Sequence, residues 1–381
     1  MARITSRARG AFILILCLVL AVPSLSACSP SSSETTGVVS DPVPVLAYYY
    51  IWFDTQSWER AKTDYPLLGR YSSSNIDVMR QHIQWAKSAG ITGFIVSWKS
   101  TDKLNQRLEQ LIKVADEEKF KLAIIYQGLD FQRDPLPVSQ VDADLSYFIE
   151  HYADDPAFSL YEKPLVIWSG TWEYSRADVE NVVLGKREHI LILASEKNVD
   201  GYSRIADLVD GDAYYWSSVN PDTFPNYAEK LTGMSEAVHA HGGLWIAPAS
   251  PGFDARLIGG TTVVDRKDGQ TLQTQFNTAM QSSPDAIGLI SWNEFSENSH
   301  IEPSENYGDR YLKALTKIRR VSAPVVKNFD SSEPDTTAGD FDSSEPAGTL
   351  NSLGADRLFA LGVIGLLIVV SLFVVIRRTI H

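Results

Sequence analysis

The sequence predicts a (β/α)8 barrel between residues 44 and 320. Short apolar runs alternate there with amphipathic stretches, and this alternation occurs eight times. Most of the apolar runs are continuous, which is typical of parallel strands that are buried on both faces. Eight strand–helix units over this length fit the barrel, and an open doubly wound sheet is the competing fold.

The elements follow one another in strict order. The predicted strands are 45–53, 91–98, 121–128, 164–169, 189–195, 213–217, 244–249 and 286–292. The predicted helices are 75–89, 103–118, 143–152, 176–183, a weaker one near 203–209, 227–241, 271–281 and 307–318. The first helix has Ile76, Met79 and Ile83 at the spacing of one helical face.

Composition restricts the classes of partner and cofactor. The formal net charge is −13 and no stripe of Lys and Arg is present, so nucleic acid is not expected as a partner. The two cysteines, Cys17 and Cys28, both lie near the N-terminus. The predicted barrel therefore has no disulfide and no cysteine-based metal site. The sequence also contains no zinc-protease motif and no phosphate-binding loop, and no cofactor is expected.

The N-terminal residues read as an export signal. Arg3, Arg7 and Arg9 precede an apolar stretch at 12–22 that is too short to span a membrane comfortably. Leu25-Ser26-Ala27-Cys28 resembles the lipobox of bacterial lipoproteins, in which the cysteine is acylated after cleavage. We expect a signal peptide at 1–28 with lipidation of Cys28, or else ordinary signal cleavage. Residues 29–43, rich in Ser, Thr and Pro, then predict a flexible tether.

The C-terminal residues predict a membrane anchor. Residues 358–376 are apolar or small and uncharged, long enough for a transmembrane helix, and a buried core helix is the weaker reading. Arg377 and Arg378 follow at once, which places the tail 377–381 in the cytoplasm and the barrel on the extracellular side. The acidic, Ser- and Pro-rich residues 321–357 predict a disordered stalk.

Aromatic side chains recur where the predicted strands end. Active sites of (β/α)8 barrels lie at these carboxyl ends, and aromatic faces stack on sugar rings. One such residue is usually core packing, but the recurrence favours a carbohydrate-binding cleft. The predicted substrate-binding residues are Tyr50, Trp52, Trp98, Tyr126, Tyr215, Trp216, Asp254, Trp292 and Asn293.

Two carboxylates follow the eighth predicted strand. Hydrolysis of a glycosidic bond uses one carboxyl group to protonate the leaving oxygen and another to assist attack at the sugar carbon. Glu294 ends the strand and Glu297 lies three residues later, so we expect these two to be the catalytic pair. A pair of solvated surface acids is the competing reading. Glu302, before Pro303, is expected to be a structural or rim residue.

The surrounding motifs are recognisable together. Residues 291–297, Ser-Trp-Asn-Glu-Phe-Ser-Glu, continue into Ser-His-Ile-Glu-Pro at 299–303. Tyr49-Tyr50-Ile51-Trp52, the segment 67–98 and Pro251-Gly252-Phe253-Asp254 with Arg266 precede them in order. Together these motifs resemble the glycoside hydrolase family 99 endo-α-mannosidases and their bacterial relatives.

This resemblance implies a metal-free (β/α)8 hydrolase that cleaves within α-mannoside chains and retains the anomeric configuration. It implies that Glu294 is the base toward the substrate's own 2-hydroxyl, giving a 1,2-anhydro sugar, and that Glu297 is the acid and then the base. The two pKa values must then differ, with Glu297 protonated at rest. Phe295, Ser296 and Asn298 depart from the family pattern beside these acids.

The sequence thus predicts a membrane-anchored extracellular glycosidase, endo-acting and retaining on α-mannoside-type glycans, whose partners are a carbohydrate polymer or oligosaccharide and the membrane. Two alternatives remain open at this stage. One is a non-catalytic glycan-binding surface protein. The other is a hydrolase or transglycosylase of another envelope α-glycan.

Overall fold

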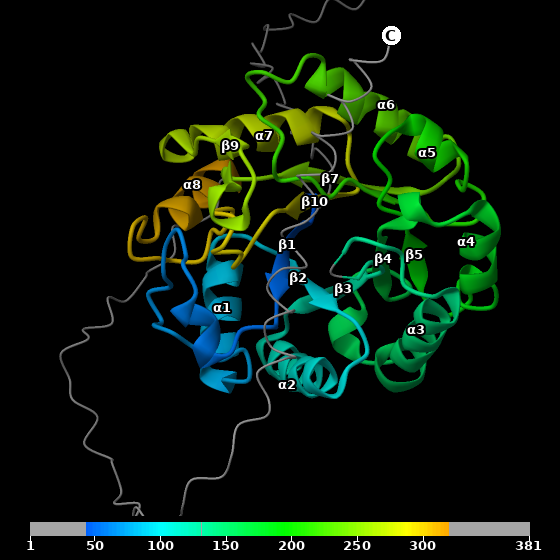
Figure 1. Ribbon diagram of the computed structural model, residues 1–381, viewed down its shortest axis with the longest axis horizontal. Coiled ribbons are helices and arrows are strands. Elements are labelled where there is room, and N and C mark those ends of the chain that lie inside the picture. The colour runs from blue at the N-terminus through cyan, green and yellow to red at the C-terminus, as the bar shows by residue number, and fades with distance from the viewer. Residues whose placement is uncertain (1–42, 131, 320–381) are drawn as a thin grey trace, which may run out of the picture. The chain divides into compact units, whose positions relative to one another are not determined.

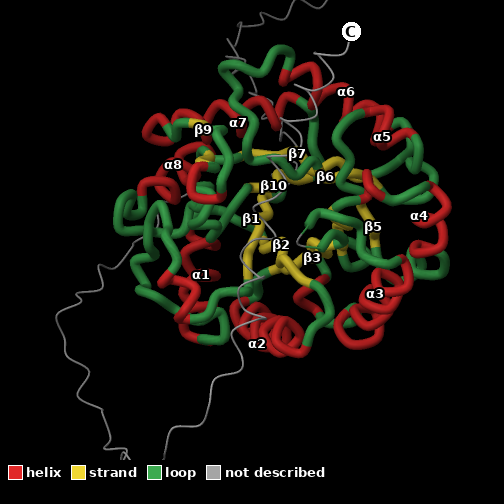
Figure 2. Tube along the Cα trace, in the orientation of Figure 1, coloured by secondary structure: helices red, strands yellow, loops and turns green. Residues whose placement is uncertain are grey.

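Eight parallel strands form a ring that is surrounded by helices (Figures 1 and 2). The computed structural model describes residues 43–130 and 132–319. Neighbouring strands follow the order β5-β4-β3-β2-β1-β10-β7-β6. Their bounds are β1 Val45–Tyr50, β2 Gly93–Trp98, β3 Lys121–Gln127, β4 Leu165–Ser169, β5 Leu191–Leu193, β6 Gly211–Ala213, β7 Leu244–Ala249 and β10 Ala286–Leu289.

The ring is closed between β5 and β6 by one parallel bridge, between Ala194 and Asp212. The amide of Ala194 donates to the carbonyl of Gly211 at 3.0 Å, and the amide of Ala213 donates to the carbonyl of Ala194 at 2.9 Å. This closure confirms the predicted (β/α)8 barrel over the open doubly wound sheet.

Helices cover the outside of the ring (Figure 2). Their bounds are α1 Ile76–Ser88, α2 Asp102–Glu118, α3 Val138–Tyr152, α4 Arg176–Val183, α5 Val199–Ser203, α6 Tyr227–His239, α7 Gln270–Gln281 and α8 Arg310–Arg319. Side chains at their N-termini explain several starts: the Asn75 oxygen accepts from two amides of α1, and Ser175 forms a capping box with Asp178 in α4. A short hairpin, β8 Phe253–Asp254 with β9 Val263–Val264, lies between β7 and α7.

Two predicted elements are displaced. The strand predicted at 213–217 is β6, Gly211–Ala213, because Tyr215 and Trp216 leave the ladder and lie half-buried in the following loop. Their aromatic, strand-favouring composition made the loop look like strand. The weak helix predicted near 203–209 is α5, Val199–Ser203, which begins where the Asn198 side chain caps the amide of Gly201 at 2.8 Å.

Two packed layers hold the barrel. Successive strand residues point to opposite faces, so Leu46 and Tyr48 fill the interior while Ala47 and Tyr49 pack against the helices. The same alternation sends Ile95 and Ile125 inward. Both layers consist of side chains with almost no exposed surface, in agreement with the continuous apolar runs in the sequence.

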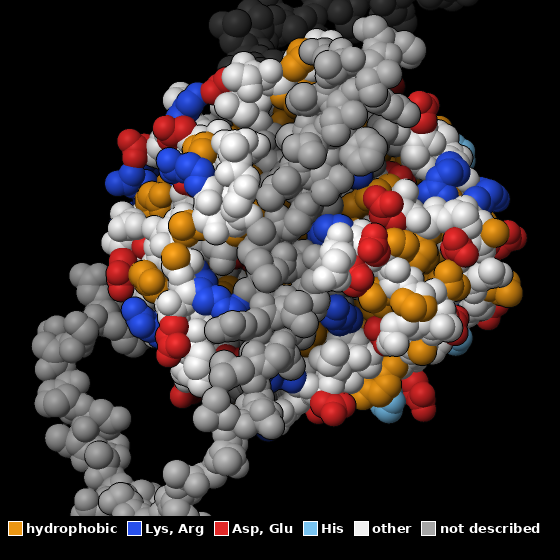
Figure 3. All heavy atoms as spheres, in the orientation of Figure 1, with side chains coloured by type: hydrophobic (Ala, Val, Ile, Leu, Met, Phe, Trp, Pro, Cys, Tyr) orange, Lys and Arg blue, Asp and Glu red, His pale blue; other side chains and the backbone are white. Residues whose placement is uncertain are grey.

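The predicted signal peptide, tether, stalk and transmembrane helix lie outside the described residues. Within 43–130 and 132–319, no helix is long and apolar enough to cross a membrane. The visible face of the described part carries acidic and basic side chains that are interspersed with one another (Figure 3).

A buried polar chain ties β1 and α1 to the segment that follows β10. His82 in α1 hydrogen-bonds Tyr49 at 3.0 Å through Nδ1 and Glu302 at 3.0 Å through Nε2. The second carboxylate oxygen of Glu302 accepts from the hydroxyl of Tyr71 at 2.8 Å. Glu302 is only 1% exposed, so it is structural, and the rim alternative does not apply.

Replacing Glu302 with Ala should lower the free energy of unfolding by about 2–6 kcal/mol, because the buried side chains of Tyr71 and His82 would each lose a hydrogen-bond partner. Urea unfolding followed by circular dichroism measures the change. Glu305→Ala is the control, since Glu305 is an exposed carboxylate three residues later and should change stability by less than about 0.5 kcal/mol. Equal midpoints for the two variants would contradict the structural role.

Candidate active site

The segment after β10 is held in place at the carboxyl ends of the strands, which we call the barrel mouth. The amide of Glu294 donates to the Ser291 hydroxyl at 2.9 Å, and the amide of Ser291 donates to the carbonyl of Ser299 at 2.8 Å. The amide of Asp254 donates to the carbonyl of Glu297 at 2.7 Å. These bonds fix both predicted catalytic glutamates to the rim of the barrel.

The Asn293 side chain joins this segment to the end of β1. Its Oδ1 accepts from the amide of Tyr50 at 2.8 Å, and its Nδ2 donates to the carbonyl of Tyr50 at 3.0 Å. Asn293 has no exposed surface. Its predicted contact with substrate is therefore corrected, because its amide is already used to position Tyr50.

Four polar side chains gather at the mouth: Glu294, Glu297, Tyr50 and Tyr215. The hydroxyls of Tyr50 and Tyr215 hydrogen-bond each other. Burial raises the pKa of both phenols, and the charges of both glutamates raise these values further. Each tyrosine is thus within electrostatic reach of each carboxylate, although the four residues come from β1, the loop after β6 and the segment after β10.

The two carboxyl groups have different surroundings. Burial raises the pKa of Glu294, but the amide of Ser296 donates to its Oε1 at 2.9 Å and the charge of Lys62 also lowers that pKa. Burial raises the pKa of Glu297 well above its usual range, and the charge of Glu294 raises it further. Glu297 is therefore the more readily protonated group, and Glu294 the more readily ionised.

Lys62 and Arg133 are site residues that the sequence reasoning missed. Neither ends a predicted strand, so position in the barrel did not single them out. Lys62 lowers the pKa of Glu294, and Arg133 lowers that of Glu297. Arg133 has a left-handed backbone with φ of 72°, and its buried Nε has no hydrogen-bond partner among the described residues. A backbone outlier of this kind, energetically costly for a residue with a Cβ, recurs at functional sites.

Some of the predicted aromatic residues do lie at the mouth. Trp52 stacks on Tyr50 with ring centroids 4.4 Å apart, and both Trp52 and Trp216 are half-buried. Tyr215 rests against Tyr48 at 4.4 Å. Each of these half-buried rings keeps some exposed surface, so contact with a sugar remains a prediction for them.

The other predicted aromatics do not face the mouth. Trp98, Tyr126 and Trp292 have no exposed surface and belong to the layer between strands and helices. The indole of Trp98 donates to Asn105 at 2.9 Å, and the hydroxyl of Tyr126 donates to Asp144 at 3.0 Å. The prediction that these three rings stack on substrate is wrong. Trp98 and Tyr126 point outward because side chains alternate along a strand, and Trp292, which lies beyond β10, packs into the same outer layer.

The carboxylate of Asp254 is paired with a residue two positions later in the chain. Both of its carboxylate oxygens accept from the exposed Arg256, with Nε to Oδ1 at 2.9 Å. Its backbone amide holds Glu297, as described above. The predicted contact between the Asp254 carboxylate and substrate stays a prediction, and its visible role is to position the loop.

The departures from the family pattern fall into two kinds. Phe295 is fully buried and stacks on His300 with centroids 4.1 Å apart, while Asn298 hydrogen-bonds Tyr307 through its amide at 3.3 Å. In these contacts both residues touch other parts of the segment 295–307 and not the carboxyl groups of Glu294 and Glu297. Of the three, Ser296 is the residue that contacts a predicted catalytic group, because its amide donates to Glu294.

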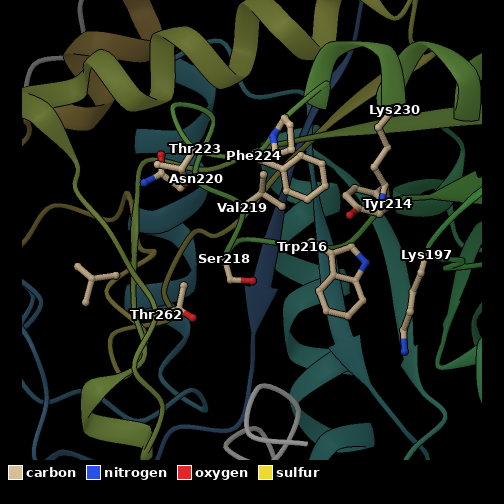
Figure 4. A pocket seen from close by; sticks show the side chains of 12 residues that line it. Lys197, Tyr214, Trp216, Ser218, Val219, Asn220, Thr223, Phe224, Lys230 and Thr262 are labelled. Atoms are coloured by element: carbon tan, nitrogen blue, oxygen red, sulfur yellow. The ribbon is translucent and has the colours of Figure 1, made fainter. Parts of the chain in front are cut away.

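No group of three or more His, Cys, Asp or Glu side chains in the described ranges has the arrangement of a metal site. An open cavity of about 570 Å³ does lie beside the mouth, lined by Trp216, Phe224, Lys197 and Lys230 among others (Figure 4).

Comparisons with known proteins agree with this geometry. The model of "Glycosyl hydrolase family 99" matches residues 54–311. The mouse glycoprotein endo-alpha-1,2-mannosidase is 22% identical over 265 residues, covering 62% of this chain and 56% of its own length. The human glycoprotein endo-alpha-1,2-mannosidase-like protein is also 22% identical over 265 residues, with the same coverage of both chains. The chain thus spans a little over half the length of these curated relatives.

Among solved structures, the endo-alpha-mannosidase of this family from Bacteroides thetaiotaomicron has a TM-score of 0.64 and 21% identity, and the match covers 73% of this chain and 97% of that one. This similarity shows the same barrel fold. The family model covers most of the described residues, including the segment that bears Glu294 and Glu297. The chain therefore belongs to glycoside hydrolase family 99.

Proposed function

We propose that this protein is an endo-acting, retaining glycosidase that cleaves α-mannoside-type glycans at Glu294 and Glu297. The observation that carries the proposal is the unlike environment of the two carboxyl groups at the barrel mouth. A protein that only bound glycans would have no need for one protonated and one ionised carboxyl side by side. The names of its relatives, as endo-alpha-mannosidases, support the choice of linkage.

The proposed reaction has two steps. In the first, ionised Glu294 takes the proton of the substrate's 2-hydroxyl as O2 attacks C1, and Glu297 gives its proton to the departing glycosidic oxygen. In the second, Glu297, now ionised, takes a proton from water as the water oxygen attacks C1. As this new bond forms, the C1–O2 bond breaks and O2 recovers its proton from Glu294. Two displacements at C1 return the original configuration.

We also propose that the barrel is held outside the membrane by the 358–376 segment, with an acyl group on Cys28 as a second attachment. A single acyl chain gives only reversible binding, whereas a transmembrane helix is effectively permanent. The substrate would then be a glycan of the cell's surroundings or of its own envelope.

Replacing either glutamate with Gln should lower kcat on α-mannan at least about a hundredfold, because general acid–base catalysis supplies a factor of this size or more. The purified full-length chain and both variants would be incubated with α-mannan, with α-glucan as a second polymer, and the products followed by NMR. Product of the retained configuration from mannan supports the proposal. No product from either polymer, or equal activity in all three proteins, would overturn it.

The pH profile should respond to Lys62 and Arg133 separately. Burial raises the pKa of both carboxyl groups, so both limbs of kcat/KM against pH should lie above the usual range of glutamate. Lys62→Met removes a charge that lowers the pKa of Glu294, and should move the acidic limb upward. Arg133→Met removes a charge that lowers the pKa of Glu297, and should move the alkaline limb upward.

Charge-retaining Lys62→Arg and Arg133→Lys are the matched controls for these shifts. Each should restore the corresponding limb toward that of the wild type. If the same limb moved in both Met variants, the roles assigned to the two carboxyl groups would be wrong.

Attachment to the membrane is tested by fractionation. The wild-type chain should sediment with membranes, resist extraction by carbonate and be cut by protease added outside intact cells. Removing 358–381 should make it extractable, and Cys28→Ser should abolish incorporation of a labelled fatty acid. Recovery of the wild type in the soluble fraction would refute anchoring.

A further inference from the structure

Two residues in the wall of the open cavity are joined to the segment that bears Glu294 and Glu297. Trp216, in its wall, directly follows Tyr215, whose hydroxyl contacts Tyr50. Val263, also in its wall, pairs with Asp254, whose amide holds Glu297. If one sugar of a glycan is bound at the mouth, a neighbouring sugar of the same glycan can therefore reach this cavity.

Two lysines lie in the cavity wall against aromatic rings. Lys197 Nζ is 4.4 Å from the ring centroid of Trp172 and 5.7 Å from that of Trp216. Lys230 Nζ is 4.8 Å from the ring of Tyr214 and 5.7 Å from that of Phe224. These contacts hold both ammonium groups in place without neutralising their charge.

Neither lysine forms an ion pair within the described residues. None of the described residues that line the cavity is acidic, although the chain as a whole has a net charge of −13. Burial lowers the pKa of Lys197, and the positive charge of Arg133 lowers it further, while the charges of Glu173 and Glu196 raise it. Glu196 is itself paired with Arg204 at 3.3 Å. Burial lowers the pKa of Lys230.

A site for a neutral sugar would need the aromatic faces but not the lysines. Partly desolvated ammonium groups without carboxylate partners are costly unless an anion arrives to pair with them. The wall also contains hydroxyl and amide side chains from Ser218, Asn220 and Thr223, which suit the rest of a sugar ring. The cavity thus combines a stacking surface, hydrogen-bonding groups and two positive charges.

We propose that this cavity binds a sugar bearing an anionic group, a phosphate or a carboxylate, on the glycan that is cut at Glu294 and Glu297. The proposal rests on the proposed function and narrows it to acidic α-mannoside glycans. Lys230 and Lys197 pair with the anion, and Trp216 and Phe224 contact the ring that carries it.

Binding is measured by titration calorimetry on the full-length Glu294→Gln variant, so that no turnover is needed. The probes are mannose, mannose 6-phosphate, glucuronic acid and inorganic phosphate. Mannose 6-phosphate or glucuronic acid should bind at least about tenfold more tightly than mannose, the gain expected of one hydrogen bond to a charged group. Raising the salt concentration should reduce this difference.

Added to this background, Lys230→Met should abolish the difference between the acidic and the neutral sugar. Lys230→Arg should retain it, which shows that loss in the Met variant is due to charge and not to misfolding. Lys113→Met is the matched control, because Lys113 is exposed on α2 and distant in sequence from every cavity residue. It should leave all four affinities unchanged.

Whichever acidic sugar binds more tightly identifies the preferred anion: phosphate for mannose 6-phosphate, carboxylate for glucuronic acid. Equal affinity for mannose and for both acidic sugars would overturn the proposal, as would a preference that survives Lys230→Met. Inorganic phosphate binding as tightly as mannose 6-phosphate would also overturn it, since the sugar would then contribute nothing. These outcomes concern binding alone, so they are distinguishable from failure of the chain to hydrolyse mannan.

Discussion

The two hydrogen bonds between the Asn293 side chain and the backbone of Tyr50 are the constraint on which the site depends. The regular pairing of β1 with β10 ends at Ala47 and Leu289, and beyond that point the Asn293 side chain supplies two hydrogen bonds between the two segments. Because Glu294 is the next residue, its position relative to Tyr50 is set by the backbone and not by a flexible side chain. Tyr71 and Glu302 carry the same constraint outward to α1 through His82.

The barrel itself could be predicted because each strand and helix is encoded by the residues within that element. Continuous apolar runs and amphipathic stretches identify strands and helices one at a time, and their order then selects the topology. Glu294 and Glu297 could be placed on the mouth for the same reason, as residues that follow the eighth strand, although β10 ends at Leu289 and not at 292 as predicted. The prediction failed for Trp98 and Tyr126 where one further local rule was not applied, the alternation of side chains along each strand.

Lys62 and Arg133 could not be found in this way. Both act through space on carboxylates more than 150 residues away in the chain, and nothing in their own neighbourhood marks them. The start of β6 was missed for a related reason. Its residues Gly211, Asp212 and Ala213 are poor strand formers, held by the partners Ala194 and β7, whereas the aromatic residues that look like strand belong to the loop.

Strand pairing is more extensive on one side of the barrel than on the other. β1, which supports Tyr50, pairs over five residues with β2, whereas β5 and β6 are three-residue strands joined to each other by a single bridge. Lys197 and Trp216 lie in the loops that follow these short strands, whereas Glu294 and Glu297 lie in the segment that follows β10. The residues of these loops that lie beyond Tyr215 can therefore change without moving the segment that bears Glu294 and Glu297. Relatives that keep the two glutamates would be expected to differ most in the residues that follow β5 and Tyr215.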